Sequence, residues 1–265
     1  MVPIIQSHPA NTKGRDLIIG DLHGHRTVLD NLLLASSFDY SKDRLFFVGD
    51  LTDRGPENLE SLDLLREPWF FPVLGNHDFN LMLVGFKGDD GKGIIPANIP
   101  GTLQTSTPQP PWDLWEFAGQ AGGRWIEKLN KKGWAYLLET SKLLQSVPHI
   151  RVIGTGEDRF HTVHAGLHVQ EKITIDNAAT NEYVDKNFYA RNPFWGTLGL
   201  ITHRYEQYEE TSGKELSHTY CGHTSVTTPT YFAQHLNIDT GCGKGGKLTM
   251  ICHQTKETWS MSDRK

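Results

Sequence analysis

Apolar runs alternate with amphipathic stretches through the first third of the chain. The runs DLIIGD (16–21), RLFFVGD (44–50) and WFFPVLGN (69–76) are short and apolar, and each ends in glycine followed by Asp or Asn. After each run, apolar residues recur at i, i+3 and i+4, which is typical of a helix that buries one face. This order predicts a βαβαβα chain whose first three strands are parallel.

The pattern changes after residue 86. Residues 87–111 are rich in Gly and Pro without periodicity, so we expect an inserted loop there, followed by cap helices at about 112–130 and 133–146. Further strands are predicted, with TGCGKGG (240–246) as the turn between the last two: FHTVHAG (160–166), SHTYCGH (217–223), TYFAQHLNID (230–239) and KLTMICH (247–253). This hairpin-rich end predicts a second, mixed sheet packed against the first.

Composition and charge narrow the classes of partner. The chain has 26 Lys and Arg against 31 Asp and Glu, a net charge of −5, so no general basic face for nucleic acid or a membrane surface is expected. No apolar run approaches the roughly 20 residues that cross a bilayer. The N-terminus lacks a secretory pattern, and three cysteines without a C-x-x-C pair fit a reducing compartment. We therefore expect a cytoplasmic protein.

Polar side chains follow the predicted parallel strands where each strand ends. Asp21, His23, Asp50 and Asn76 lie there, and two later strand ends add His164 and His223. Any one of them could cap a helix or make a turn, but polar residues at the carboxyl ends of parallel strands converge on one crevice.

Such a set of Asp, His and Asn suits a pair of divalent cations, Mn²⁺, Fe or Zn²⁺. A pair of metals needs a bridging carboxylate, and Asp50, on the central strand, is the natural candidate. Two cations would let this acidic protein bind an anion such as phosphate.

Five segments resemble the ordered motifs of the calcineurin-like metallophosphoesterases. They are GDLHGH (20–25), GDLTDRGPE (49–57), GNHD (75–78), HAG (164–166) and GHT (222–224). Within that superfamily the chain is similar to the phosphoprotein-phosphatase group, in its small bacterial and phage-type members. Ser225 stands where many members of the wider superfamily carry a further histidine, which agrees with this group.

The resemblance implies a fold and a cofactor. The fold is α/β, with two mixed β-sheets facing each other as a sandwich and helices outside, in a single domain over 1–265 with an insertion and cap at about 87–147. The expected cofactor would be a pair of divalent ions, with Mn²⁺ favoured and Fe or Zn²⁺ as alternatives. One ion would be held by Asp21, His23 and Asp50, and the other by Asp50, Asn76, His164 and His223.

The resemblance also implies how the remaining residues act. A hydroxide that bridges the metals would attack phosphorus, and His77, oriented by Asp53, would protonate the departing oxygen. Arg54 would bind the phosphate oxygens together with a later arginine, for which Arg191 is favoured and Arg204 is the alternative.

The leading activity is a serine/threonine or dual-specificity protein phosphatase acting on a phosphorylated protein or peptide. The alternative is a hydrolase of diadenosine polyphosphates or of another nucleotide, because residues 75–84 and 239–249 also resemble the symmetrical diadenosine tetraphosphate hydrolases. Asp53 argues against it, since those hydrolases tend to lack an acid beside the arginine. A non-catalytic binding module is the third reading, but no predicted metal ligand is missing.

Two further patterns are read as structural. GCGKGGKL (241–248) approaches a phosphate-binding loop, but Leu248 stands in place of the hydroxyl residue and a strand pattern follows. Trp112, Trp115 and Trp125 are expected to pack within the cap, with the wall of a substrate cleft as the alternative.

Overall fold

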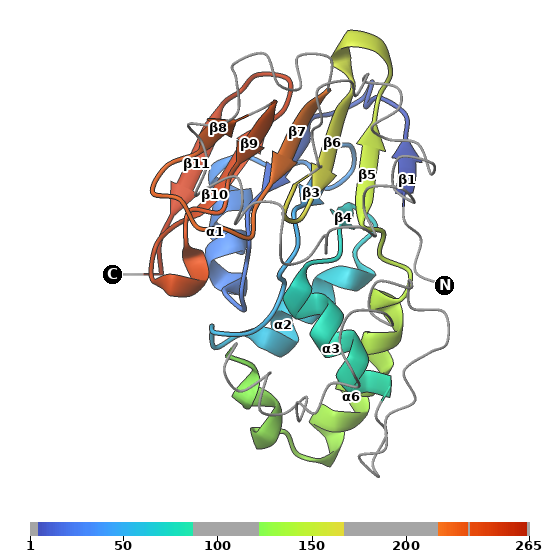
Figure 1. The fold of residues 1–265 in the computed structure, drawn as a ribbon, viewed down its shortest axis with the longest axis vertical. Helices are drawn as coiled ribbons and strands as arrows, with labels where there is room; N and C mark the ends of the chain where they lie inside the picture. Colours follow the sequence, from blue (N-terminus) through green and yellow to red (C-terminus); the bar gives the residue numbers. More distant parts are fainter. Residues whose placement is uncertain (1–4, 87–121, 167–216, 233, 264–265) are drawn as a thin grey trace, which may run out of the picture.

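Two β-sheets and four α-helices make up the part of the chain that the structure describes. The structure is a computed structural model, and it describes residues 5–86, 122–166, 217–232 and 234–263. One sheet has the order β11-β10-β2-β3-β4 and the other the order β1-β5-β6-β7-β9-β8 (Figure 1). The strands are β1 (Ile5–His8), β2 (Asp16–Ile19), β3 (Arg44–Phe47), β4 (Phe70–Pro72), β5 (Ile150–Ile153), β6 (Phe160–Val163), β7 (His218–Cys221), β8 (Thr230–Phe232), β9 (His235–Asn237), β10 (Leu248–Cys252) and β11 (Thr258–Met261).

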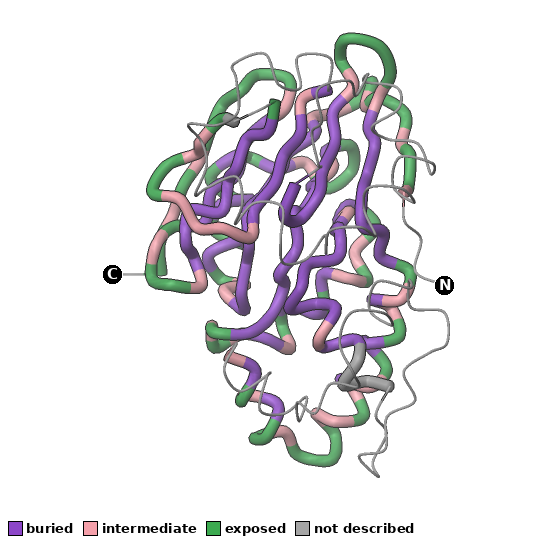
Figure 2. Tube along the Cα trace, viewed as in Figure 1, coloured by how far each residue is buried: buried purple, intermediate pink, exposed green. Residues whose placement is uncertain are grey.

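The two sheets pack face to face through alternate residues of their strands. Ile18 and Phe46 of the five-stranded sheet share a buried apolar cluster with Phe160, Tyr220 and Leu236 of the six-stranded sheet. Successive side chains of a strand point to opposite faces, so the neighbours of Ile18 and Phe46 in sequence face away from the six-stranded sheet. Buried residues run almost continuously along the inner strands of both sheets, whereas the edge strands β1 and β11 are partly exposed (Figure 2).

The outward face of the five-stranded sheet is covered by helices. They are α1 (Arg26–Ala35), α2 (Asn58–Leu62), α3 (Asn76–Phe86) and α6 (Lys131–Leu144), with 3₁₀ turns at 63–66, 123–128, 156–158 and 242–244. Leu17 and Leu45 of the sheet share the larger apolar cluster with Leu29 of α1, Leu62 of α2 and Leu137 of α6. Helices α3 and α6 pack side by side (Figure 1). Within the described ranges, no helix is both long and apolar enough to cross a membrane.

The predicted α/β sandwich of two mixed sheets is confirmed. Strands β2, β3 and β4 are parallel, as predicted, with Ile18 opposite Phe46 and Phe46 opposite Phe71. The helices expected after each of them are present, and the helix expected at 133–146 is α6. Of the cap helix expected at 112–130, only residues from 122 onward are described, and they form a 3₁₀ turn. The expected loop 87–111 lies outside the described residues.

Two expectations for the C-terminal part are wrong. Residues 230–239 do not form one strand: β8 and β9 are an antiparallel pair, with Gln234 in the left-handed region at their connection. The segment 240–246 does not close a hairpin but carries the chain from one sheet to the other, because β10 pairs antiparallel with β2. Strands β1, β5 and β11 were not expected from the sequence at all.

Candidate metal centre and active site

The carboxyl ends of the parallel strands bring the candidate site residues together. Asp21 and His23 follow β2, Asp50 follows β3, and Asn76 and His77 begin α3 after β4. His164 and His223 follow the parallel strands β6 and β7 of the other sheet. Six of these seven residues are buried and the seventh, His223, is partly buried, so the site lies where the ends of the two sheets meet.

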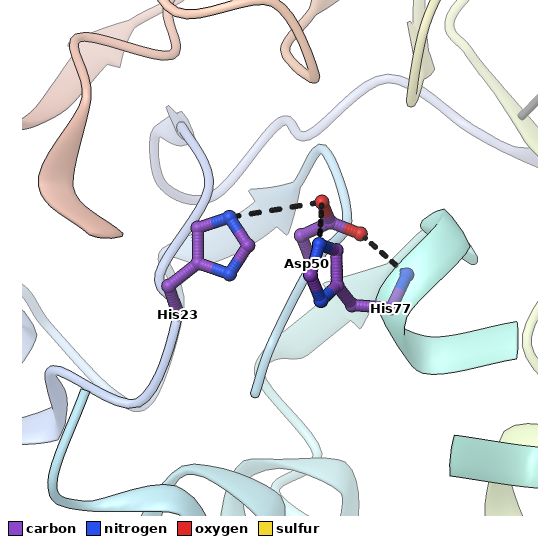
Figure 3. Close-up of side chains that lie close together, drawn as sticks. All are labelled: His23, Asp50 and His77. Carbon is purple, nitrogen blue, oxygen red and sulfur yellow. Dashed lines mark hydrogen bonds and ion pairs between the residues drawn. The ribbon is translucent and has the colours of Figure 1, made fainter. Parts of the chain in front are cut away.

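Asp50 is common to two groups of potential ligands. The first group is His23, Asp50 and His77, and the second is Asp50, His164 and His223. Asp50 Oδ2 lies 3.7 Å from His23 Nε2 and 3.8 Å from His77 Nε2, while its Oδ1 lies 3.4 Å from His164 Nε2. Figure 3 shows one oxygen of Asp50 linked to the imidazoles of His23 and His77, which come from the β2 loop and from the start of α3, and the other oxygen linked to the backbone nitrogen of His77.

An amide oxygen lies beside the second group. Asn76 Oδ1 lies 2.9 Å from both His164 Nε2 and His223 Nδ1, and these two nitrogens are 3.1 Å apart. Ligands bound at about 2.0–2.2 Å around one six-coordinate ion lie about 3 Å from one another. The spacing of the three atoms therefore fits a shared divalent cation.

The hydrogen bonds of the histidines fix which nitrogens carry lone pairs. Nδ1 of His23 bonds the carbonyl of Thr52, and Nδ1 of His164 bonds the carbonyl of Val48, both at 2.9 Å. A carbonyl oxygen only accepts, so Nδ1 is protonated in both rings, and in the neutral imidazole that a metal ligand requires Nε2 is the acceptor. His164 Nε2 and Asn76 Oδ1 are then two acceptors facing each other, an arrangement that a cation stabilises.

The electrostatics of the buried residues also fit cation binding. Burial lowers the pKa of His23 and of His223 to about 3, so both imidazoles are neutral and can act as ligands. Burial alone would raise the pKa of Asp50, but His164, His77 and His23 lower it, and the carboxylate is ionised. Burial, together with Asp239 and Asp50, raises the pKa of Asp21 well above its ordinary value. A divalent cation would offset the repulsion among these carboxylates.

Asp21 is not a member of either group. Its carboxylate accepts the backbone N–H of His223, at 3.1 Å to one oxygen and 3.3 Å to the other. His77 takes the third place in the first group, beside His23 and Asp50. Asp21 is thus bound to the loop that carries His223, across the boundary between the two sheets.

His77 lies in a hydrogen-bonded chain with Asp53 and Arg54. Its Nδ1 lies 2.6 Å from Asp53 Oδ2, and Arg54 contacts Nε2 of both His77 (3.1 Å) and His23 (2.6 Å). Burial lowers the pKa of His77, but the charges of Asp50 and Asp53 outweigh burial and raise it overall. The raised pKa favours a second proton on this ring, which would lie on Nε2 in place of the Arg54 contact and could be delivered to a bound group. The two arginines proposed to bind phosphate together with Arg54, Arg191 and Arg204, both lie outside the described residues.

Backbone strain is concentrated at this site. Eight described residues other than glycine have positive φ, and five of them are candidate site residues: His23, Asp50, Asp53, Arg54 and His223. Side chains disfavour this region by roughly 1–2 kcal/mol per residue. Such strain typically marks functional positions, where the rest of the fold imposes the geometry.

Sequence reasoning missed two residues that support the site. The Asp78 carboxylate accepts the backbone N–H groups of Asp50, Leu51 and Gly75 at 2.8–2.9 Å, and so fixes the Asp50 loop. Trp125 donates its indole N–H to Asp53 Oδ1 at 2.8 Å, a role beyond the packing expected for it. Asp78 could have been suspected as a buried acid in the first turn of α3, whereas nothing local in the sequence links Trp125 to Asp53.

Comparison with known proteins agrees with this geometry. Serine/threonine-protein phosphatase 2 of Salmonella typhimurium is 27% identical over 235 residues, which cover 88% of this chain and 90% of that protein. A symmetrical bis(5'-nucleosyl)-tetraphosphatase of Coxiella burnetii is 28% identical, over 96% of this chain and 92% of that protein. A crystal structure assigned as a diadenosine tetraphosphatase has a TM-score of 0.58 at 22% identity and covers 98% of this chain and 97% of its own, which shows a shared fold.

The match to a protein family covers most of the chain. Residues 15–215 match the family described as calcineurin-like phosphoesterase; they contain four of the five sequence motifs, and the two groups of potential ligands that share Asp50 agree with this match. The chain therefore belongs to the calcineurin-like phosphoesterase family and is a metal-dependent phosphoesterase.

Proposed function

We propose that this phosphoesterase is a serine/threonine protein phosphatase, which hydrolyses phosphomonoesters on protein or peptide substrates. The observation that carries the proposal is the His77–Asp53 pair, 2.6 Å apart and beside Asp50. Serine and threonine leave as alkoxides, which are strong bases and need a proton in the transition state. A nucleoside polyphosphate leaves as a phosphate oxyanion with a pKa of about 6, and needs no such donor.

We propose that Asp21, His23 and Asp50 hold one divalent ion, and that Asp50, Asn76, His164 and His223 hold the other. All the ligands are oxygen or imidazole, without a thiolate, which favours Mn²⁺ over softer metals. When bound, such ions supply positive charge for phosphate oxygens and lower the pKa of water toward neutrality. Asp78 keeps Asp50 in place by accepting three backbone N–H groups of the surrounding loops.

Arg54 and His77 are proposed to act directly on the substrate. The Arg54 guanidinium, which lies against His23 and His77, would bind two phosphate oxygens, with Arg191 or Arg204 as the second cation. His77 would donate the proton on Nε2 to the leaving oxygen, and Asp53 would hold the ring through Nδ1.

Three free, buried cysteines agree with a reducing compartment such as the cytoplasm.

The second candidate is hydrolysis of dinucleoside polyphosphates. The Coxiella burnetii relative favours it, because its name gives that activity and the match covers nearly the whole of both chains. Arg124 and Trp125, in the 3₁₀ turn at 123–128, could contact a phosphate and a base. A direct comparison of the two kinds of substrate decides between the two candidate functions.

The deciding test compares phosphoserine and phosphothreonine peptides with diadenosine tetraphosphate in the Mn²⁺-loaded enzyme. We expect kcat/KM to be higher for the peptides. Shortening residues 88–108 is expected to change peptide preference while sparing a small aryl phosphate. If diadenosine tetraphosphate is cleaved at least about tenfold more efficiently than every peptide, the nucleotide activity takes the place of the proposed one.

The acid role has its own test. His77→Asn is expected to slow hydrolysis of a phosphoserine peptide by roughly 10² to 10⁴ and to affect an aryl phosphate much less. The reason is that an aryl oxide leaves with little protonation. Equal losses on the two substrates would assign His77 to metal binding or positioning instead.

A further inference from the structure

Both oxygens of Asp53 have a hydrogen-bond donor. His77 Nδ1 lies 2.6 Å from Oδ2, and Trp125 Nε1 lies 2.8 Å from Oδ1. Asp53 is only 6% exposed and has φ of +75°, and its backbone N–H donates to Asn58 Oδ1 at 2.7 Å. The orientation of this carboxylate therefore depends on its partners rather than on a relaxed backbone.

The indole bond does two things for the pair. It fixes the plane of the carboxylate, because one hydrogen bond alone leaves the group free to turn about its Cβ–Cγ bond. The indole N–H only donates, so the oxygen it meets must accept. Oδ2 is then held toward His77, and the imidazole is held in the tautomer and orientation that direct Nε2 away from Asp53.

The segment that carries Trp125 also contacts the neighbouring residue of the turn. The backbone N–H of Arg54 donates to the carbonyl of Gly122 at 3.3 Å. A Cβ on Gly122, which has φ of +99°, would lie 2.9 Å from the backbone nitrogen of Arg54. Residues 122–125 thus pack directly on the Asp53–Arg54 turn, while the Trp125 ring packs against the larger apolar core.

We infer that Trp125 is a positioning residue for the proposed acid, and that Trp125, Asp53 and His77 act as one hydrogen-bonded unit. This inference rests on the proposed role of His77. It predicts that loss of the indole N–H harms the protonation of a strongly basic leaving group and leaves phosphate binding intact.

The test is Trp125→Phe, which keeps an aromatic ring against the core and removes the N–H donor together with part of the indole ring. The matched control is Trp259→Phe, a partly buried tryptophan of β11 that packs against the same core cluster. Both variants and the parent are loaded with Mn²⁺, and their metal content and melting temperature are measured. Activity is measured on a phosphoserine peptide and on an aryl phosphate.

For Trp125→Phe we expect kcat on the phosphoserine peptide to fall about tenfold, the factor that corresponds to one hydrogen bond to a charged group. KM, metal content and the rate on the aryl phosphate should stay within about twofold of the parent, as should all values for Trp259→Phe. In a protein that already carries Asp53→Asn, Trp125→Phe should cause almost no further fall in kcat on the peptide, because the two residues act on His77 through one chain of hydrogen bonds.

Three results would overturn the inference: equal losses on the two substrates, no loss on the peptide, or a full additive loss in the double variant. The His77→Asn variant separates this failure from that of the proposed function. If His77→Asn shows the leaving-group dependence and Trp125→Phe does not, only the inference is wrong. If His77→Asn does not show it, both are wrong.

Discussion

Asp50 is the single residue on which both proposed metal positions depend. Its two oxygens face different histidines, with Oδ2 toward His23 and His77 and Oδ1 toward His164. Asp21, by comparison, belongs to neither group of potential ligands among the described residues. The two carboxylates, both buried, should therefore differ in what they contribute.

Replacement of these carboxylates by amides tests the difference. We expect Asp50→Asn to lower kcat/KM on an aryl phosphate about tenfold more than Asp21→Asn, because it weakens binding of both ions. Elemental analysis should show loss of both metals in Asp50→Asn and retention of at least one in Asp21→Asn. Equal metal content in the two variants would contradict the bridging position of Asp50.

The strained backbone gives a second prediction at the residue scale. Arg54 has φ of +67° and an exposed side chain, so alanine at this position keeps the strain and glycine removes it. We expect Arg54→Gly to exceed Arg54→Ala in free energy of unfolding by about 1 kcal/mol, and both to be poor enzymes. Urea unfolding of the metal-free proteins measures this.

The exposed residue Ser37, at φ of +51°, provides the control away from the site. The free energy of unfolding of Ser37→Gly should exceed that of Ser37→Ala by a similar amount, and both variants should be fully active. If glycine gives no advantage at Arg54 while it does at Ser37, the strain assigned to the active-site turn is absent.

At the scale of elements, the segment between β9 and β10 shapes one wall of the site. A Cβ on Gly243 would lie 2.5 Å from Cδ2 of His23, so the loop rests directly on this imidazole. The loop is held by the Asp239 carboxylate, which accepts the N–H of Gly241 at 2.9 Å. The segment that resembles a phosphate-binding loop in sequence is thus a support for a candidate metal ligand.

Gly243→Ala should therefore displace His23. We expect kcat/KM on an aryl phosphate to fall roughly 10- to 100-fold, the usual consequence of moving a catalytic group by a fraction of an ångström to one ångström. Gly133→Ala in α6 is the control, because the atoms nearest to its Cβ would be those of the Leu129 side chain, the first at 3.0 Å. Unchanged activity of Gly243→Ala with an unchanged melting temperature would show that the loop can move away without cost.

The elements also show where sequence reasoning succeeds and where it fails. Apolar runs that end in Gly followed by Asp or Asn predicted β2, β3 and β4, because nearly all residues of these strands are buried and leave a clear local pattern. Strands β1 and β11 are edge strands with partly exposed residues, so they lack that pattern. The pairing of β10 with β2 depends on contacts more than 200 residues apart in the chain, which no local pattern encodes.

The same distinction applies to the site. The candidate ligands stand in short motifs beside predicted strands, and the structure brings the strand ends together. The bond from Trp125 to Asp53 spans 72 residues and depends on how the segment after residue 121 packs. Contacts of this kind follow from tertiary packing and are read only from a structure.

At the scale of the whole molecule, buried neutral histidines outside the site couple stability to pH. Burial lowers the pKa of His161 to about 3 and that of His149 to about 4, below the value of about 6.5 in an unfolded chain. The unfolded state therefore binds more protons between these values, and stability falls as the pH drops from about 6.5 toward 4.

We expect the free energy of unfolding of the metal-free protein to be lower at pH 5 than at pH 7, by up to about 2 kcal/mol for each such histidine. His161→Gln should reduce this difference, because glutamine does not titrate. Urea unfolding at the two pH values measures both effects. An identical pH dependence in His161→Gln and the parent would mean that His161 is protonated to the same extent in the folded and unfolded chains.

The two sheets contribute residues to the proposed metal centre that lie far apart along the chain. The candidate residues that follow β2, β3 and β4 of the five-stranded sheet all precede residue 78. His164 and His223 come much later in the chain, after β6 and β7 of the six-stranded sheet. The five-stranded sheet itself is completed only when β10 and β11 are made. During synthesis, the first half of the centre leaves the ribosome long before the second. A growing or prematurely terminated chain that ends before residue 223 carries His23, Asp50 and His77 without the complete second set. The phosphatase activity proposed here would then be the last property that a newly made chain acquires, and an unfinished chain would have none.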